Sequence, residues 1–568
     1  MSKKISLCMT VLAVAVLSSC SKMGPLSPDY FTVTPNPLEA QAGKVPVTIN
    51  GLFPEKYMKR KAVVTVTPVL RYEGGEALGQ PATFQGEKVV GNNQTISYRV
   101  GGNYTMKTTY DYIDPMHKSE LYLVFAATVG KKSVSIPEVK VADGVIATSE
   151  LVKRTLKSAS TSYAQDNFQR IIKKKQEANI QFLINQAKIR TGEIKSVSVQ
   201  DFLATLKDIP VEENRKAFDG IEISSYASPD GSLDFNTKLA DQRGKTTKSY
   251  VAGEMKAAGV EGNVDSKYTA EDWEGFQQLV SQSNIQDKDV IIRVLSMYND
   301  PEEREKQIRN ISAAYGDLTK EILPRLRRSR IMLHYNLIGR TDEEIMSQFN
   351  QEPAKLSVEE MLYAASMADD EEQQEKILGK MKDLYPNDYR SYNNLATLAY
   401  QRGDYAQAKQ LVDKALALNA NAPEANVNKG LLSMLDGNTA EATQYLSKGS
   451  NALGLNEALG NLYLLQGNNA QAVKAFGKDA SNSAALAQLL NKDYLSAATT
   501  LNGVAEPDAM TSYLKAIIAS RTNNADLAID NLKTAVSLDS SLADYAAKDL
   551  EFVKLRNDAA FKQITQLK

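Results

Sequence analysis

The sequence predicts a multidomain protein with an N-terminal β-sandwich, a central α/β domain and a C-terminal all-α superhelix. Three observations lead to this division. Short β-branched and aromatic runs separated by turn residues fill residues 31–150, and strand-like and helix-like segments alternate over residues 178–345. In the last third, helical units repeat with an offset of 34 residues, as from Gly403 to Gly437. The 568 residues, 43% of them apolar, suffice for about three or four domains with separate cores.

The N-terminus has the features of an export signal. Two lysines precede the apolar run ISLCMTVLAVAVL, which is shorter than the ~20 residues needed to span a bilayer. The run ends in LSSC, residues 17–20, which resembles the lipobox of bacterial lipoproteins. This resemblance implies a signal peptide over residues 1–19, lipid attachment at Cys20 and a tether over residues 20–30. An ordinary secretory signal with an accidental cysteine is the alternative, but Cys8 leaves with the signal, so Cys20 is the one thiol expected in the mature chain.

The residues after Cys20 bear on which side of the membrane the protein faces. In some Gram-negative groups, surface-exposed lipoproteins carry an acidic run directly after the lipidated cysteine. Here SKMGPLSP follows, and the first acidic residue is Asp29. The resemblance therefore implies an outer-membrane protein, anchored by its lipid and facing the periplasm.

Charge and motif content argue against several function classes. The 67 Lys and Arg residues nearly balance the 68 Asp and Glu residues, so the chain lacks the positive field that nucleic acid requires. Only two histidines occur, and GxSxG, HExxH, P-loop and paired CxxC motifs are missing. We expect no enzyme, no metal and no cofactor.

Residues 31–150 contain alternating runs such as KAVVTVTPVLRY and LYLVFAATV, divided by Gly, Pro and Asn at the spacing of an immunoglobulin-like sandwich. The segment 151–177 is polar and rich in lysine, with enough spaced apolar positions to predict a linker helix. Its run Lys173–Lys175 is expected to be a solvated face, and contact with anionic lipid or cell wall is the alternative.

The stretch IEISSYASPDGSLDFNTKLADQRGKTTKSYV, residues 221–251, predicts a strand, a turn and a helix that begins near Leu233. Arg243 lies four residues after Leu239 and four before Thr247, on the apolar side of that helix. Because an unpaired buried charge is costly, Arg243 is expected to meet a carboxylate. An internal salt bridge, with Asp230 as the nearest candidate, is one possibility.

The strand, the glycine turn and the spacing of Asn236, Leu239 and Arg243 resemble the periplasmic domain of the OmpA family, over about residues 178–345. The resemblance implies a mixed α/β sandwich that binds the diaminopimelate of peptidoglycan, with Arg243 taking its carboxylate. The acidic residue that takes the ammonium in that family falls on Ser228 here, and Asp230 is the nearest acid. A site of Arg243, Asn236, Asp230 and Ser228 and a scaffold that has lost this ligand both remain open.

Residues 356–568 resemble tetratricopeptide repeats. SYNNLATLAYQRGDYAQAKQLVDKALALNANAP has the large and small residues of that pattern, and stacked units of this kind form a superhelix with a concave face. The resemblance assigns six positions to the concave groove: Thr397, Tyr400, Leu431, Met434, Asn461 and Leu464. They predict an apolar strip for a protein partner, and packing of Leu431, Met434 and Leu464 against adjacent repeats is the alternative.

These features favour a non-catalytic lipoprotein scaffold that organises an outer-membrane protein complex, with possible contact to peptidoglycan. A surface-exposed adhesion or assembly lipoprotein with a repurposed OmpA-like domain is the alternative. A wall-processing enzyme is disfavoured, since the sequence contains no recognisable acid–base constellation.

Overall fold

A computed structural model describes residues 23–566, apart from the side chains of residues 312–314. The proposed signal peptide and Cys20 lie outside these residues. The chain divides into two compact units. One contains the described residues up to Gln165 together with Ala368 onward, and the other is Asp166–Met367.

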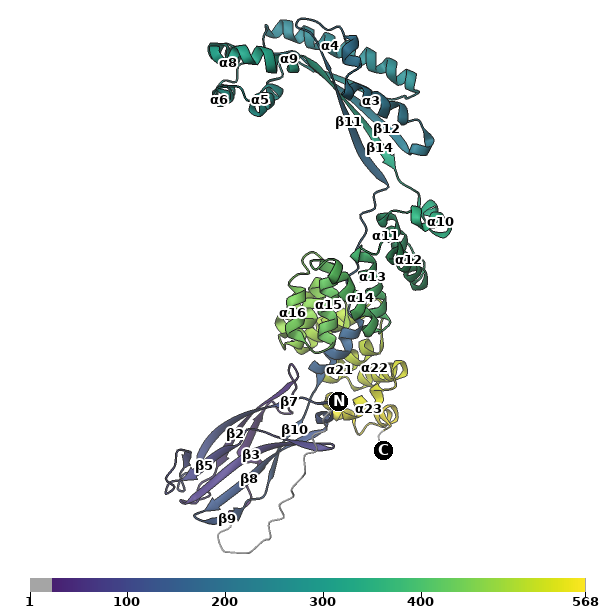
Figure 1. Cartoon of the computed structure of the whole chain (residues 1–568). Helices are drawn as coiled ribbons and strands as arrows, with labels where there is room; N and C mark the ends of the chain where they lie inside the picture. The colour runs from purple at the N-terminus through teal and green to yellow at the C-terminus, as the bar shows by residue number, and fades with distance from the viewer. Residues whose placement is uncertain (1–22, 567–568) are drawn as a thin grey trace. The chain divides into compact units, whose positions relative to one another are not determined.

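The N-terminal part of the first unit is built from two sheets (Figure 1). The smaller sheet has the order β1-β2-β7, formed by Phe31–Thr34, Lys44–Phe53 and Gly102–Asp111. The larger has the order β10-β8-β3-β5-β6, formed by Val139–Gly144, Ser119–Val129, Ala62–Tyr72, Ala82–Gly86 and Gln94–Ile96, with β4 (Gly75–Leu78) on β3 and β9 (Lys132–Ser135) on β8. All pairs are antiparallel except β5 with β6. Alternate residues of both sheets form one core, as a sandwich requires.

The second unit contains a four-stranded mixed sheet with the order β11-β14-β12-β13. Its strands are Ile171–Gln181, Arg328–Ile338, Lys216–Tyr226 and Val264–Thr269, of which only β12 and β13 are parallel. Helices α3 (Val197–Asp208) and α4 (Leu233–Ala258) pack on one face of the sheet (Figure 1). Their shared core includes Phe202, Val251, Ile223 and Leu333. The buried residues 239, 243, 247, 251 and 255 of α4 recur every four positions and so lie on one side of the helix.

A helical insertion lies between β13 and β14 and has its own core of apolar side chains. It contains α5 (Trp273–Gln282), α6 (Lys288–Met297), α7 (Pro301–Asn310), α8 (Ser312–Asp317), a π-helical turn (Leu318–Ile322) and α9 (Leu323–Leu326). Between β11 and β12, the short helix α2 (Thr191–Ile194) precedes α3, and the 3₁₀ turn Glu212–Asn214 follows it.

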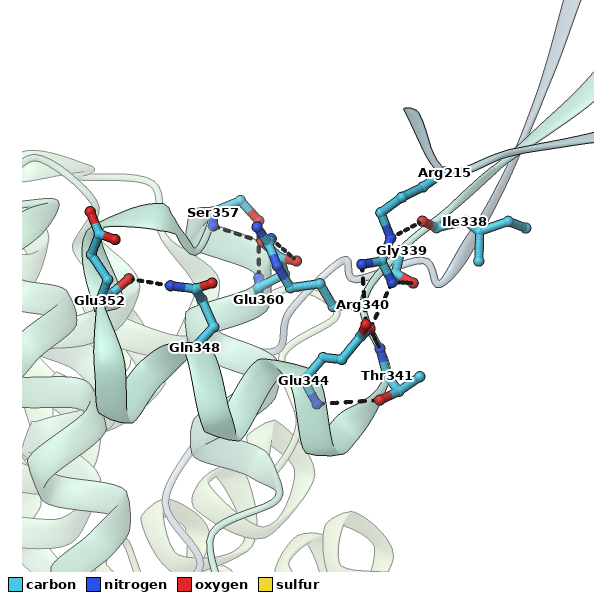
Figure 2. Close-up of polar contacts among 10 residues, drawn as sticks. All are labelled: Arg215, Ile338, Gly339, Arg340, Thr341, Glu344, Gln348, Glu352, Ser357 and Glu360. Atoms are coloured by element: carbon cyan, nitrogen blue, oxygen red, sulfur yellow. Dashed lines mark hydrogen bonds and ion pairs between the residues drawn. The ribbon is translucent and has the colours of Figure 1, made fainter. Parts of the chain in front are cut away.

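Two arginines tie the end of the sheet to the helices that follow it (Figure 2). Arg215 donates to the carbonyls of Ile338 and Gly339 at 3.1 Å each and pairs with Glu344 at 2.6 Å. Glu344 also completes the capping box of α10 (Asp342–Gln351). Arg340 pairs at 2.8 Å with Glu360, which closes a second capping box with Ser357 at the start of α11 (Val358–Ser366). The exit from β14 is therefore fixed by ion pairs that also cap two helices.

The linker helix expected over residues 151–177 is present only in part. Short turns cover Thr148–Leu151, Val152–Thr155 (α1) and Leu156–Ser158, the backbone is extended at Ala159, and no helix or strand follows before β11. Residues 171–177 belong to β11, which pairs with β14 over its whole length. The exposed lysine run Lys173–Lys175 is therefore on a strand, because cross-strand pairing, which local periodicity does not report, decides the conformation.

The C-terminal part of the first unit is a series of antiparallel helix pairs (Figure 1). After α12 (Glu371–Leu384), the pairs are α13–α14 (Tyr389–Gln401, Tyr405–Leu418), α15–α16 (Pro423–Leu435, Thr439–Leu446), α17–α18 (Leu455–Leu465, Asn469–Phe476), α19–α20 (Asn482–Leu490, Tyr494–Asn502) and α21–α22 (Ala509–Arg521, Ala525–Leu538), followed by α23 (Leu542–Lys548), the 3₁₀ turn Leu550–Leu555 and α24 (Ala559–Thr565).

The turn within each pair has a recurring chemistry. A residue with positive φ, such as Gly403 or Gly437, ends the first helix, and an Asp or Asn side chain then caps the second. Lys492 and Asn523 take the same left-handed conformation in later pairs. The predicted all-α repeat region is thus confirmed.

Candidate functional site

The concave face of the repeats is covered by a segment of the same chain. Residues 148–164, which connect the sandwich to the second unit, lie against the first helices of successive pairs. The segment runs opposite to the order of the repeats: Thr148 bonds Glu551, Ser160 bonds Glu457 on α17, and Ala164 bonds Asn394 on α13. The surface of the first helices, where the sequence predicts a partner groove, is therefore occupied by the protein's own chain.

Asparagine side chains hold the backbone of the extended part of this segment. Asn428 accepts from the Ser162 N–H at 2.7 Å and donates to the Ser162 carbonyl at 2.8 Å. Asn394 makes the same pair of bonds to Ala164, at 2.8 and 2.9 Å. Asn393 donates to the Ser162 carbonyl at 2.9 Å. Because Ser162 and Ala164 are two residues apart, they present their amides to the same side of an extended chain.

The segment makes further polar contacts with the repeats. The buried Glu457 accepts from the Ser160 N–H at 3.1 Å, and burial raises the pKa of this carboxyl. The Ser483 hydroxyl donates to the Thr155 hydroxyl at 2.8 Å, and the Tyr400 hydroxyl donates to the Leu156 carbonyl at 2.7 Å.

All six residues predicted for the groove are buried in the structure: Thr397, Tyr400, Leu431, Met434, Asn461 and Leu464. Tyr400, Leu431 and Met434 share an apolar cluster with Leu156 and Ala159 of the segment, and Leu464 shares one with Leu151 and Val152. The same clusters contain residues of neighbouring repeats, so these side chains pack both on the repeats and beneath the segment. Asn461 donates to Glu457 O of its own helix at 3.1 Å, and Thr397 donates to Asn394 O at 2.7 Å.

The asparagines that hold the segment were not predicted from the sequence. Asn394 and Asn428 lie three residues before Thr397 and Leu431, one helical turn away on the same face. A signal existed, because the two asparagines are separated by the same offset of 34 residues that relates Gly403 to Gly437. A buried amide recurring at the repeat period indicates a recurring hydrogen-bond partner.

The second unit has a pocket of about 360 Å³ between the start of α4 and the end of β12. All four residues predicted for a wall ligand line it: Arg243, Asn236, Asp230 and Ser228. Arg327, which directly precedes β14, lines it as well and was not predicted.

Arg243 is held by backbone carbonyls. Its guanidinium donates to Tyr226 O at 2.8 Å, Gln186 O at 3.0 Å and Leu183 O at 3.2 Å, and its side chain is fully buried. Burial, with repulsion from Arg327 as a smaller cause, lowers the pKa of Arg243 to about 10, so it stays charged at neutral pH. Arg243 thus fastens the loop after β11 to the end of β12.

The expected salt bridge between Arg243 and Asp230 is not formed. Asp230 pairs instead with Arg327 at 2.8 Å and accepts from Ser228, whose hydroxyl also accepts from Arg327 at 3.1 Å. This alternative of an internal pair fails because Arg327, 97 residues further along the chain, is brought to Asp230 by the pairing of β14 with β12. The side chains of Arg327 and Asp230 are 12% and 18% exposed, so a ligand in the pocket can reach both members of this ion pair.

A buried cluster of titratable side chains lies where the sandwich meets the end of the repeats. Asp549 accepts from the Tyr513 hydroxyl at 2.8 Å and from the Glu551 N–H at 3.0 Å, with His117 Nε2 at 4.0 Å. Burial raises the pKa of Asp549 to about 7 and lowers the pKa of His117 to about 4. This imidazole is therefore neutral at neutral pH.

The described residues contain neither a candidate metal site nor a candidate membrane-spanning helix. Within residues 23–566, His, Cys, Asp and Glu form no group of three or more that could hold a metal ion. In the same part of the chain, no helix has the length and apolar character needed to cross a membrane.

A family model for the tetratricopeptide repeat matches residues 389–421, which contain α13 and α14. Among solved structures, the chain is similar to a tetratricopeptide repeat protein from Parabacteroides merdae ATCC 43184, at 16% identity over 40% of this chain and 90% of that one, with a TM-score of 0.28. It is also similar to Pseudomonas aeruginosa pilF, at 15% identity over 40% and 96% with a TM-score of 0.26, and to YrrB, described as a TPR protein with an unusual peptide-binding site, at 21% identity over 30% and 97% with a TM-score of 0.22. A comparison with curated proteins finds no match. The family match identifies α13 and α14 as a tetratricopeptide repeat, and the helix pairs that continue beyond it make the C-terminal part of the chain an all-helical region of the same kind, a fold used for protein–protein interaction.

Proposed function

We propose that this protein is a non-catalytic scaffold, anchored in the outer membrane by a lipid on Cys20 and facing the periplasm, where its OmpA-like second unit contacts peptidoglycan and its repeats organise a protein complex. The repeat match supports the interaction role. The apolar leader ending in LSSC supports the anchor. The mixed sheet of the second unit, with the Arg243 helix directly after β12, supports the OmpA-like assignment.

The observation that carries wall contact is the charge composition of the pocket in the second unit. Diaminopimelate presents an ammonium and carboxylates on one small group. Asp230 and Arg327 offer one carboxylate and one guanidinium side by side, both partly exposed, in a pocket within the size range of small-ligand sites. When a zwitterionic ligand binds, its ammonium can pair with Asp230 and its carboxylate with Arg327. Each charge then keeps a partner, which avoids the cost of an unpaired buried ion.

Arg243 has a supporting role in this proposal. Its guanidinium has no exposed surface and already satisfies three carbonyls. Direct binding of the ligand carboxylate is therefore assigned to Arg327, whose guanidinium can donate two parallel hydrogen bonds to one carboxylate. Asn236, whose amide donates to Gly231 O at 2.9 Å, holds the turn that presents Asp230.

Sedimentation with purified diaminopimelate-containing sacculi tests the proposal. Wild type is expected to pellet, free meso-diaminopimelate to release it, and Asp230→Asn or Arg327→Gln to lose at least about tenfold in affinity, the loss that corresponds to ~1.4 kcal/mol. Lys238→Gln is the matched control, because Lys238 is an exposed cation on the same helix, outside the pocket. A wild type that stays in the supernatant, or variants that pellet like wild type, would overturn wall contact. Unchanged circular dichroism of the variants excludes unfolding as the cause.

A further inference from the structure

The groove of the repeats recognises backbone amides of its own segment. Asn428 and Asn394 each bond both the N–H and the carbonyl of one residue, Ser162 and Ala164. Bonds of this kind depend on an extended backbone and on no particular side chain, so they fit any chain of the same conformation.

Side-chain size limits which chain fits. Ser162 and Ala164 are completely buried, whereas Ser160 and Gln165 are exposed. The groove thus has room for a small side chain at each buried position, and a buried charge without a partner would be costly there. The ligand class is a segment that has Ala, Ser or Gly at the two buried alternate positions and no charge at either of them.

Covalent connection favours the resident segment. Because it is part of the same chain, its effective concentration at the groove is about millimolar, so a separate peptide of equal intrinsic affinity competes poorly. Its hydrogen bonds span α13, α15, α17 and α19, which lets it close much of the groove at once.

We propose that the groove of the repeats is a backbone-reading peptide site that the chain keeps closed with its own residues 155–164, and that an extended small-residue segment of a partner binds only when these residues are displaced. The inference rests on the proposed scaffold role of the repeats and identifies the chemistry and the regulation of their site. It does not depend on the ligand of the Asp230–Arg327 pocket.

The probe is a fluorescent peptide with the sequence of residues 155–165, TLKSASTSYAQ, added to the full chain. In Ser162→Pro/Ala164→Pro the segment loses the two N–H groups that bond Asn428 and Asn394. This opened variant is expected to bind the peptide at least tenfold more tightly than wild type. Thr161→Pro is the matched control, since it stiffens the same segment without removing either of those N–H groups, and it is expected to exclude the peptide as wild type does.

Two further variants keep the test decisive. Adding Asn394→Ala and Asn428→Ala to the opened variant should abolish peptide binding while helical circular dichroism is retained. If the double proline variant fails to fold, Ala164→Glu opens the groove by placing a charge at a fully buried position.

Equal peptide binding by wild type and a folded opened variant, or no binding by either, would overturn the inference. Because the peptide assay involves neither sacculi nor membranes, its failure is distinct from failure of wall contact or of the lipid anchor.

Discussion

Asn428→Ala is the sharpest test of how the repeats hold residues 148–164. The substitution removes two hydrogen bonds to Ser162, of 2.7 and 2.8 Å. The Ser162 carbonyl keeps its bond from Asn393 at 2.9 Å, but its buried N–H loses its partner. An orphaned buried donor costs about 1–3 kcal/mol and a lost hydrogen bond about 1 kcal/mol, so the free energy that holds the segment should fall by about 2–4 kcal/mol.

Amide hydrogen exchange measures this loss directly, since it reports the free energy of local opening. At about tenfold per 1.4 kcal/mol, the amides of Ser160, Ser162 and Ala164 should exchange about 30- to 700-fold faster in the variant. Asn461→Ala is the matched control, because Asn461 is equally buried in a first helix but bonds only Glu457 O of that helix. We expect it to leave these amides nearly unchanged. Equal effects of the two substitutions, or amides that exchange freely in wild type, would refute the reasoning.

Three further predictions follow from the buried charges and from the leader. The pKa of Asp549 is raised to about 7, so the folded state keeps a proton that the unfolded state releases above its ordinary pKa of 3.8. The free energy of unfolding of wild type, relative to that of Asp549→Asn, should therefore be greatest below about pH 4. This difference should be lost as the pH rises to about 7. Melting of both proteins between pH 4 and pH 8 checks this, and a difference that does not vary with pH contradicts it. Arg243→Met should lower the free energy of unfolding by at least about 3 kcal/mol, because three carbonyls lose a charged donor. A loss below about 1 kcal/mol in thermal melts would show that these hydrogen bonds contribute little. Cys20→Ala should abolish labelling with palmitate and release the protein from the membrane fraction, and equal labelling of the variant would end the lipoprotein proposal.

The repeats and the βα unit around Arg243 were predictable from the sequence because their signals are local. The spacing of small and large residues, a left-handed residue such as Gly403 and an Asp or Asn cap determine each helix pair. The same holds for the placement of Arg243 on the buried side of α4, since periods of four residues set a helical face.

Tertiary structure decided what these elements meet. Arg327 reaches Asp230 because β14 pairs with β12. Two of the three carbonyls around Arg243 come from a loop 57 and 60 residues earlier in the chain. Residues 159–164 read as part of a helix in isolation, yet they lie extended because the amides of Asn394 and Asn428 satisfy their backbone. The recurring asparagines indicate that the groove has a hydrogen-bond partner, but they do not indicate which segment supplies it. The occupant of the groove, unlike the groove itself, could therefore be found only in the folded chain.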